Sequence, residues 1–130
     1  MENQSVFGGA KWGDPVIVAS RAQMFAEFLF MDEIAGPNAS AFIADYCEKA
    51  RRRLKSYADK AQAEYKGNDR ALVHLAGKVK YVLAHIELAE CYGKQLGIMT
   101  ENMTFRRHAL AYISMVQAEN EALEHFHYAG

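Results

Sequence analysis

The most constraining feature of the sequence is a stripe of residues near its carboxyl end, spaced alternately by four and by three. Its members are Phe105, Ala109, Tyr112, Val116, Glu119, Leu123 and Phe126. A helix that turns once every ~3.6 residues places all of them on one face. Since all but Glu119 are apolar, the stripe predicts a helix that packs lengthwise against other helices, and it favours an all-α fold.

Signals that end helices divide the rest of the chain. Gly36 and Pro37 lie before one long periodic stretch, and Gly67 and Asn68 lie between that stretch and the next. Glycine adopts the left-handed conformation that closes a helix, and proline cannot extend one. With a further apolar stretch at 15–35, the sequence predicts about four helices. Short connections make neighbouring helices antiparallel, so we expect an up-down helical bundle.

Residues 1–14 show no periodicity and contain two large aromatic residues, Phe7 and Trp12. We expect an extended N-terminal arm at 1–14, followed by one helical-bundle domain at 15–130. Such an arm frays unless its side chains become buried, because ordering the backbone costs entropy. The two aromatic residues therefore dock either on their own domain or on a neighbouring molecule, and both alternatives stay open.

Composition excludes several classes of function. The formal net charge is −1, so no overall field attracts the chain to nucleic acid or to an anionic membrane. The most apolar run, at 16–34, is interrupted by charged residues and is a poor membrane span. The first residues lack the basic start and apolar core of a signal peptide. With Cys47 and Cys91 interpreted as free thiols, we expect a cytoplasmic protein.

The favoured functional hypothesis is a non-enzymatic assembly or adaptor subunit. Its expected partner-binding residues are Phe7, Trp12, Phe25, Phe28 and Met31, which lie in the arm and the first helix. A monomer rarely leaves this much aromatic surface in water, and such residues are favoured at interfaces. We expect a homo-oligomer or a protein partner. A structural component of a particle such as a phage virion is one setting, by analogy of architecture. A compact monomer that buries these residues is the alternative.

The second hypothesis is a nucleic-acid-associated protein that uses a basic run on the second helix. The run consists of Lys49, Arg51, Arg52, Arg53 and Lys55. Such a face can hold phosphates with a salt-dependent affinity, and it also fits an acidic protein partner. Glu48 and Asp59 are interleaved with the run, so a solvated or ion-paired face is the structural interpretation.

A metal-dependent enzyme is a distant third hypothesis. Counting helical levels places four potential ligands at similar heights: Glu27, Tyr46, Glu90 and His108. Ferritin-like di-iron sites need a Glu-x-x-His motif on each of two helices, and this chain has one, at Glu124 and His127. A single metal ion at His125 and His127 is a simpler alternative. We expect no cofactor, no small-molecule substrate and no catalytic residue.

The same counting of levels predicts specific contacts between helices. Ala50, His85 and Tyr112 are expected in one layer of the bundle, and Glu119 is expected near Lys78. An unpaired buried charge costs several kcal/mol. The sequence therefore predicts that Glu119 either forms an ion pair with Lys78 or lies at a contact between subunits.

Overall fold

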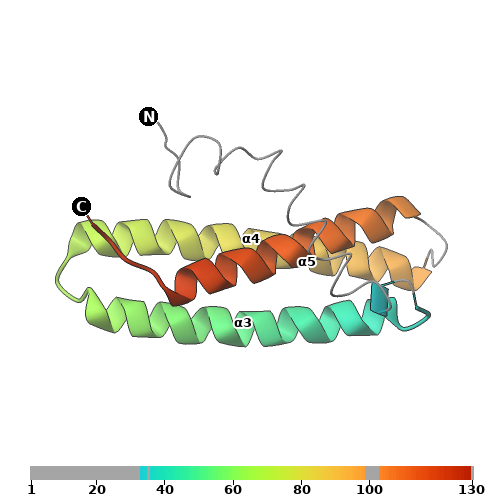
Figure 1. Cartoon of the computed structure of the whole chain (residues 1–130), viewed down its shortest axis with the longest axis horizontal. Coiled ribbons are helices and arrows are strands. Elements are labelled where there is room, and N and C mark those ends of the chain that lie inside the picture. Colours follow the sequence, from blue (N-terminus) through green and yellow to red (C-terminus); the bar gives the residue numbers. More distant parts are fainter. Residues whose placement is uncertain (1–32, 35, 99–102, 130) are drawn as a thin grey trace.

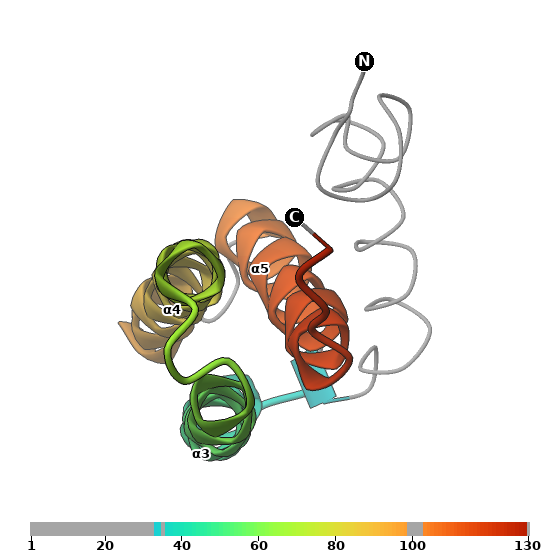
Figure 2. The ribbon, with the colours of Figure 1, turned by 90° about the vertical axis from the view of Figure 1, so that its left-hand side faces the viewer.

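The described part of the chain is entirely helical. In this computed structural model the described residues are 33–34, 36–98 and 103–129, and they contain no strand. Three helices span most of them: α3 (Ala39–Glu64), α4 (Asp69–Ile98) and α5 (Met103–Glu124). Consecutive helices run antiparallel (Figure 1), and the view along the bundle places them at the corners of a triangle (Figure 2). The all-α prediction is confirmed.

Other predictions fall outside the described residues. These are the N-terminal arm at 1–14 and nearly all of the helix at 15–35. They include the expected partner-binding residues Phe7, Trp12, Phe25, Phe28 and Met31. No helix in the described ranges is long and apolar enough to cross a membrane.

The predicted helix ends are confirmed between α3 and α4. At the other end of α3, Asn38 occupies the N-cap position, but its side chain makes no capping hydrogen bond. Gly67 has a φ of 89°, a left-handed conformation that glycine adopts without a steric penalty. The Asn68 side-chain oxygen then accepts a hydrogen bond of 3.2 Å from the Ala71 amide, which caps the start of α4. This turn reverses the chain and places α4 beside α3.

The apolar stripes form one core between the three helices. The largest fully buried apolar side chains are Ile34, Ile43, Ile86, Ile113, Val82 and Val116. Each contributes about 1.5–3 kcal/mol relative to an exposed side chain. The stripe on α5 is confirmed as the buried face, with Ala109 and Val116 fully buried and Glu119 only 5% exposed.

Helix α5 is inclined to α3 (Figure 1). His85 and Tyr112 lie together as predicted, with ring centroids 5.9 Å apart. The placement of Ala50 beside Tyr112 is wrong, because the Ala50 carbonyl accepts a 3.2 Å hydrogen bond from Asn120. Asn120 lies about two turns further along α5. Counting levels assumes parallel rods, and the inclination of α5 shifts the register.

A close contact between α3 and α4 depends on a glycine. A Cβ atom added at Gly93 would lie 2.7 Å from Cγ2 and 3.1 Å from Cβ of Ile43. Ile43 is fully buried and β-branched, so its side chain cannot rotate away. Only a residue without a side chain fits between these helices at this point.

We expect Gly93→Ala to lower the free energy of unfolding by about 1–3 kcal/mol, because it overpacks the contact with Ile43. Gly77 is the matched control on the same helix, since a Cβ there has no neighbour within 4 Å. Gly77→Ala should raise the same quantity by about 0.5–1 kcal/mol. Urea unfolding followed by circular dichroism measures both. Equal effects of the two variants would contradict the described packing of α3 on α4.

Candidate functional site

A row of aromatic and histidine rings follows the line where α4 meets α5. We call it the aromatic seam, and its members are Tyr81, His85, Tyr92, Phe105, His108 and Tyr112. Side chains spaced by three, four or seven residues along each helix supply it, so both helices present rings to the same line. The seam is the largest group of rings in contact among the described residues.

Stacking joins the two helices in the middle of the seam. The Tyr92 ring stacks on Tyr112, with centroids 5.7 Å apart and an interplanar angle of 10°. The Tyr92 ring also stacks on His108, at 4.7 Å and 23°. His85 extends the row, with its ring 5.9 Å from Tyr112 and 4.5 Å from Tyr81. Contacts of this kind contribute about 0.5–1.5 kcal/mol each beyond the burial of area.

One edge of the seam remains open to solvent. Tyr81 is 45% exposed, and Leu88, which follows it on α4, is 39% exposed. The second apolar stripe on α4, which includes Tyr81, Leu88 and Tyr92, predicts a second packing partner for this helix. The rings of this stripe pack on α5, which is therefore the second partner. α5 does not cover the whole stripe, and Tyr81 and Leu88 remain partly exposed.

A buried carboxylate lies beside the open end of the seam. Glu119 is 5% exposed, and its Oε2 atom has no hydrogen-bond partner in the described part of the chain. Burial raises the pKa of Glu119 to about 7, and the nearby charge of Lys78 lowers that pKa by less. Lys78 is thus the positive charge near Glu119, as predicted. Its effect on the pKa of Glu119 is smaller than the effect of burial. Burial, with the charge of Glu119, also raises the pKa of the Tyr81 phenol.

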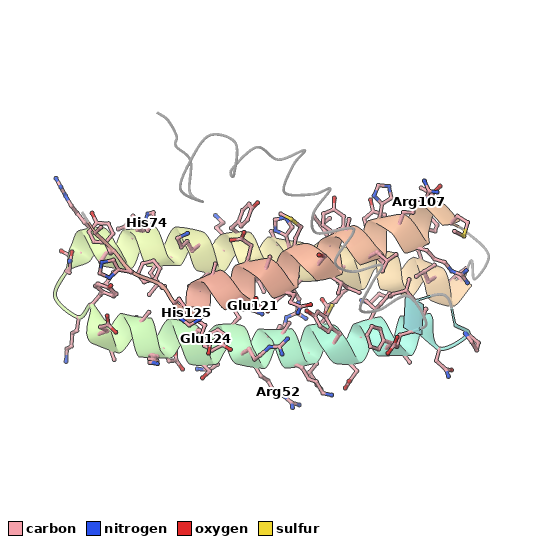
Figure 3. All side chains as sticks on the ribbon, in the orientation of Figure 1. Arg52, His74, Arg107, Glu121, Glu124 and His125 are labelled. Carbon is pink, nitrogen blue, oxygen red and sulfur yellow. The ribbon has the colours of Figure 1, made fainter. Side chains whose placement is uncertain are left out.

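The basic run on α3 is tied to local partners. Three of its members form ion pairs within α3: Lys49 with Asp45 at 3.0 Å, Arg52 with Glu48 at 3.1 Å and Lys55 with Asp59 at 2.9 Å. Figure 3 shows Arg52 projecting from the outer side of α3, away from the other helices. These pairs are exposed, and pairs of this kind contribute about 0–1 kcal/mol each.

The remaining two arginines of the run reach other groups. Arg51 forms two hydrogen bonds with the Glu90 carboxylate of α4, one of them at 2.8 Å. Arg53 lies over the Tyr46 ring at 5.8 Å. Each basic residue of the run therefore has an acidic or aromatic neighbour. Binding of nucleic acid or of an acidic partner by this face stays a prediction.

The proposed metal ligands do not converge in the described ranges. No three histidine, cysteine or acidic side chains of those ranges lie close enough to hold a metal ion. Glu90 pairs with Arg51, and His108 stacks on Tyr92. Glu27 lies outside the described residues. His125 and His127 are exposed, in the segment that follows α5.

The segment after α5 contacts the turn between α3 and α4. The Phe126 ring meets Tyr65 edge to face at 5.4 Å, and the Tyr128 amide donates a 3.0 Å hydrogen bond to the Tyr65 hydroxyl. His74 contacts both rings of this segment, at 5.9 Å and 5.7 Å. A hollow of about 400 Å³ beside it is lined by His74, Tyr128 and the start of α4. Another, of about 380 Å³, lies between α3 and α4.

Comparisons with known proteins identify no relative of this chain. No family model, no curated protein and no solved structure matches the chain.

The raised pKa of Glu119 predicts a pH-dependent stability. Its folded-state pKa of about 7 exceeds the ordinary glutamate pKa of 4.5, so the folded state binds this proton more tightly. Its contribution is fully present below pH 4.5 and is lost as the pH rises through about 7. Glu119→Gln removes the charged form, and we expect it to stabilise the protein at pH 8 by on the order of 2 kcal/mol.

Urea unfolding of the wild type and the variant between pH 5 and pH 8 measures this difference. Glu121→Gln is the matched control, because Glu121 is an exposed acid on the same helix. It should follow the wild type throughout. A stability difference for Glu119→Gln that stays constant across this range would show that the carboxyl group is already ionised at the lower pH.

Proposed function

We propose that this chain is a non-enzymatic helical subunit that assembles with itself or with a protein partner. The aromatic seam is part of its contact surface. The observation that carries the proposal is the combination of stacked rings with a solvent-open edge, formed by Tyr81 and Leu88. Aromatic side chains that are rigid and half-buried supply contact area at a low cost in conformational entropy.

The chemistry of the seam supports a contact surface over a catalytic site. Its rings stack on one another, and the adjacent carboxylate is buried beside a phenol. The buried thiol of Cys47 is a poor nucleophile, because burial raises its pKa to about 12. A surface of stacked rings binds by area and shape, which is what an assembly subunit needs.

The proposal extends to the start of the chain. The N-terminal arm at 1–14 and the first helix would supply a second contact through Phe7, Trp12, Phe25, Phe28 and Met31, and the helix would be the fourth of the bundle. Their aromatic and apolar side chains support this part of the proposal. The subunit would act in the cytoplasm or in a particle assembled there, such as a virion.

The seam can be tested by changing its open edge. We expect Tyr81→Ser combined with Leu88→Ser to weaken association at least about tenfold, since the variant loses apolar contact area. Static light scattering across a dilution series measures the mass of the particle. Val73→Ser is the control, because Val73 is 73% exposed on α4 but belongs to no ring contact of the seam. A wild-type chain that stays monomeric up to about 100 µM would contradict self-association.

The arm can be tested by removing it. We expect deletion of residues 1–14 to reduce the number of subunits per particle, since the arm would no longer cross to a neighbour. Light scattering measures that number, and circular dichroism confirms that the helices remain. An unchanged particle mass would place the arm outside the contact and leave the seam as the proposed surface.

A further inference from the structure

The side of α4 that faces away from α3 and α5 is exposed along two heptads. Figure 2 shows no other described helix on this side. We call it the outer α4 face, and its members, all exposed, are Gly77, Lys80, Tyr81, Ala84, Glu87, Leu88 and Cys91. They recur at steps of three and four residues, opposite the side on which Val82, Ile86 and Ala89 are buried.

The two charges of the outer α4 face, Lys80 and Glu87, have no local partner. Neighbours on a helix surface are three or four residues apart, and no residue at those distances from either one carries the opposite charge. Neither forms an ion pair with another described residue, whereas three cations of α3 each pair with an acid one turn away. Glu87 acts on Arg51 from a distance, but Arg51 forms its hydrogen bonds with Glu90. Lys80 and Glu87 are therefore available to another molecule.

The outer α4 face is arranged symmetrically about Ala84. Lys80 and Tyr81 lie four and three residues before Ala84, while Glu87 and Leu88 lie three and four residues after it. Residues seven apart are nearly aligned along a helix, so Lys80 and Glu87 share one flank of the face. By the same spacing, Tyr81 and Leu88 share the other flank. Small residues occupy the line between the flanks at intervals of seven: Gly77, Ala84 and Cys91.

We propose that the outer α4 face binds the same face of a second copy of this chain, with the two α4 helices antiparallel and a two-fold axis at Ala84. A two-fold rotation reverses the helix direction and keeps each flank on its own side. Lys80 therefore meets Glu87 of the partner subunit, and Tyr81 meets Leu88 of the partner subunit. Each contact occurs twice. The inference rests on the proposed function, because it includes the open edge of the aromatic seam in the contact.

Complementarity identifies the occupant as a second copy. In the antiparallel pair each charge meets its opposite and each apolar flank residue meets another, so the face satisfies itself. Small residues on the centre line let two helices approach to about 8 Å between axes, which brings the flanks into contact. A parallel pair would leave Lys80 about 10 Å from Glu87 of the partner subunit along the axis. The contact ends at Gly77 and Cys91, and Val73 lies beyond it.

Reversal of the two charges tests the proposal on the full-length chain. Lys80→Glu and Glu87→Lys each place like charges opposite one another, so each variant alone should associate at least about tenfold more weakly than the wild type. An equimolar mixture of the two variants should regain wild-type association, because opposite charges then meet at both positions. Static light scattering measures the particle mass. Lys60→Glu is the matched control, since Lys60 is an exposed lysine on α3, and it should associate as the wild type does.

A disulfide test determines the direction of the two helices. Ala84→Cys combined with Cys91→Ser places one thiol of each copy at the two-fold axis, within reach of a disulfide bond. We expect diamide oxidation to convert most of this variant to a covalent dimer on a non-reducing gel. The wild type should form none, because its Cys91 thiols would lie about 21 Å apart along the axis and its other thiol, Cys47, is buried.

Four results would each overturn the proposal: undiminished association of either charge variant, a mixture that does not regain association, no covalent dimer from Ala84→Cys, or a covalent dimer of the wild type. These results separate this inference from the proposed function. If Tyr81→Ser with Leu88→Ser weakens association while the charge variants behave as the wild type does, the seam is a contact surface but α4 does not pair with itself. If the serine variant has no effect, the proposed role of the seam fails whatever the charge variants do.

Discussion

The shared apolar core of α3, α4 and α5 is the constraint on which the rest of the structure depends. Each helix gives the core one stripe, and the fully buried Ile43, Ile86 and Ile113 come from the three different helices. Their burial holds the helices at fixed rotations. On α4, those rotations leave a second stripe at the border with α5, where the rings of the aromatic seam meet. The seam is thus a consequence of how the core orients the helices.

Polar groups inside this core help to fix its geometry, although burying them costs free energy. Asn120 is 2% exposed and donates a hydrogen bond to the Ala50 carbonyl, which fixes the register of α5 against α3. Ser114 is 1% exposed on the same helix. Glu119 differs from these two residues because burial shifts its pKa towards neutrality.

The charges of α3 show how local pairing limits a basic surface. Lys49, Arg52 and Lys55 of the basic run each face an acid one turn away, and such exposed pairs add little stability. Their main effect is to reduce the field that the run presents to an anionic molecule. Arg51 differs from these three residues, because its bidentate contact with Glu90 joins α3 to α4. It therefore contributes to the packing of the bundle as well as to its charge.

The sequence alone determined the features that depend on neighbours in the chain. The turn at Gly67 and Asn68 and the stripe through Val116 follow from backbone conformation and helical periodicity, which act within a few residues. The contact between His85 and Tyr112 could also be predicted from the sequence, because the short connection after α4 fixes how α4 and α5 align. Helices that pair across one turn inherit their register from it.

Only the tertiary structure decided the contacts that depend on the angle between helices. The inclination of α5 placed Asn120 at Ala50, and packing between α3 and α4 gave Arg51 its partner Glu90. The burial of Glu119 beside Tyr81 also required the folded arrangement. Periodicity specifies which face of a helix is buried. The crossing angle and the side-chain rotamers, which arise from contacts between residues distant in the chain, determine what that face meets.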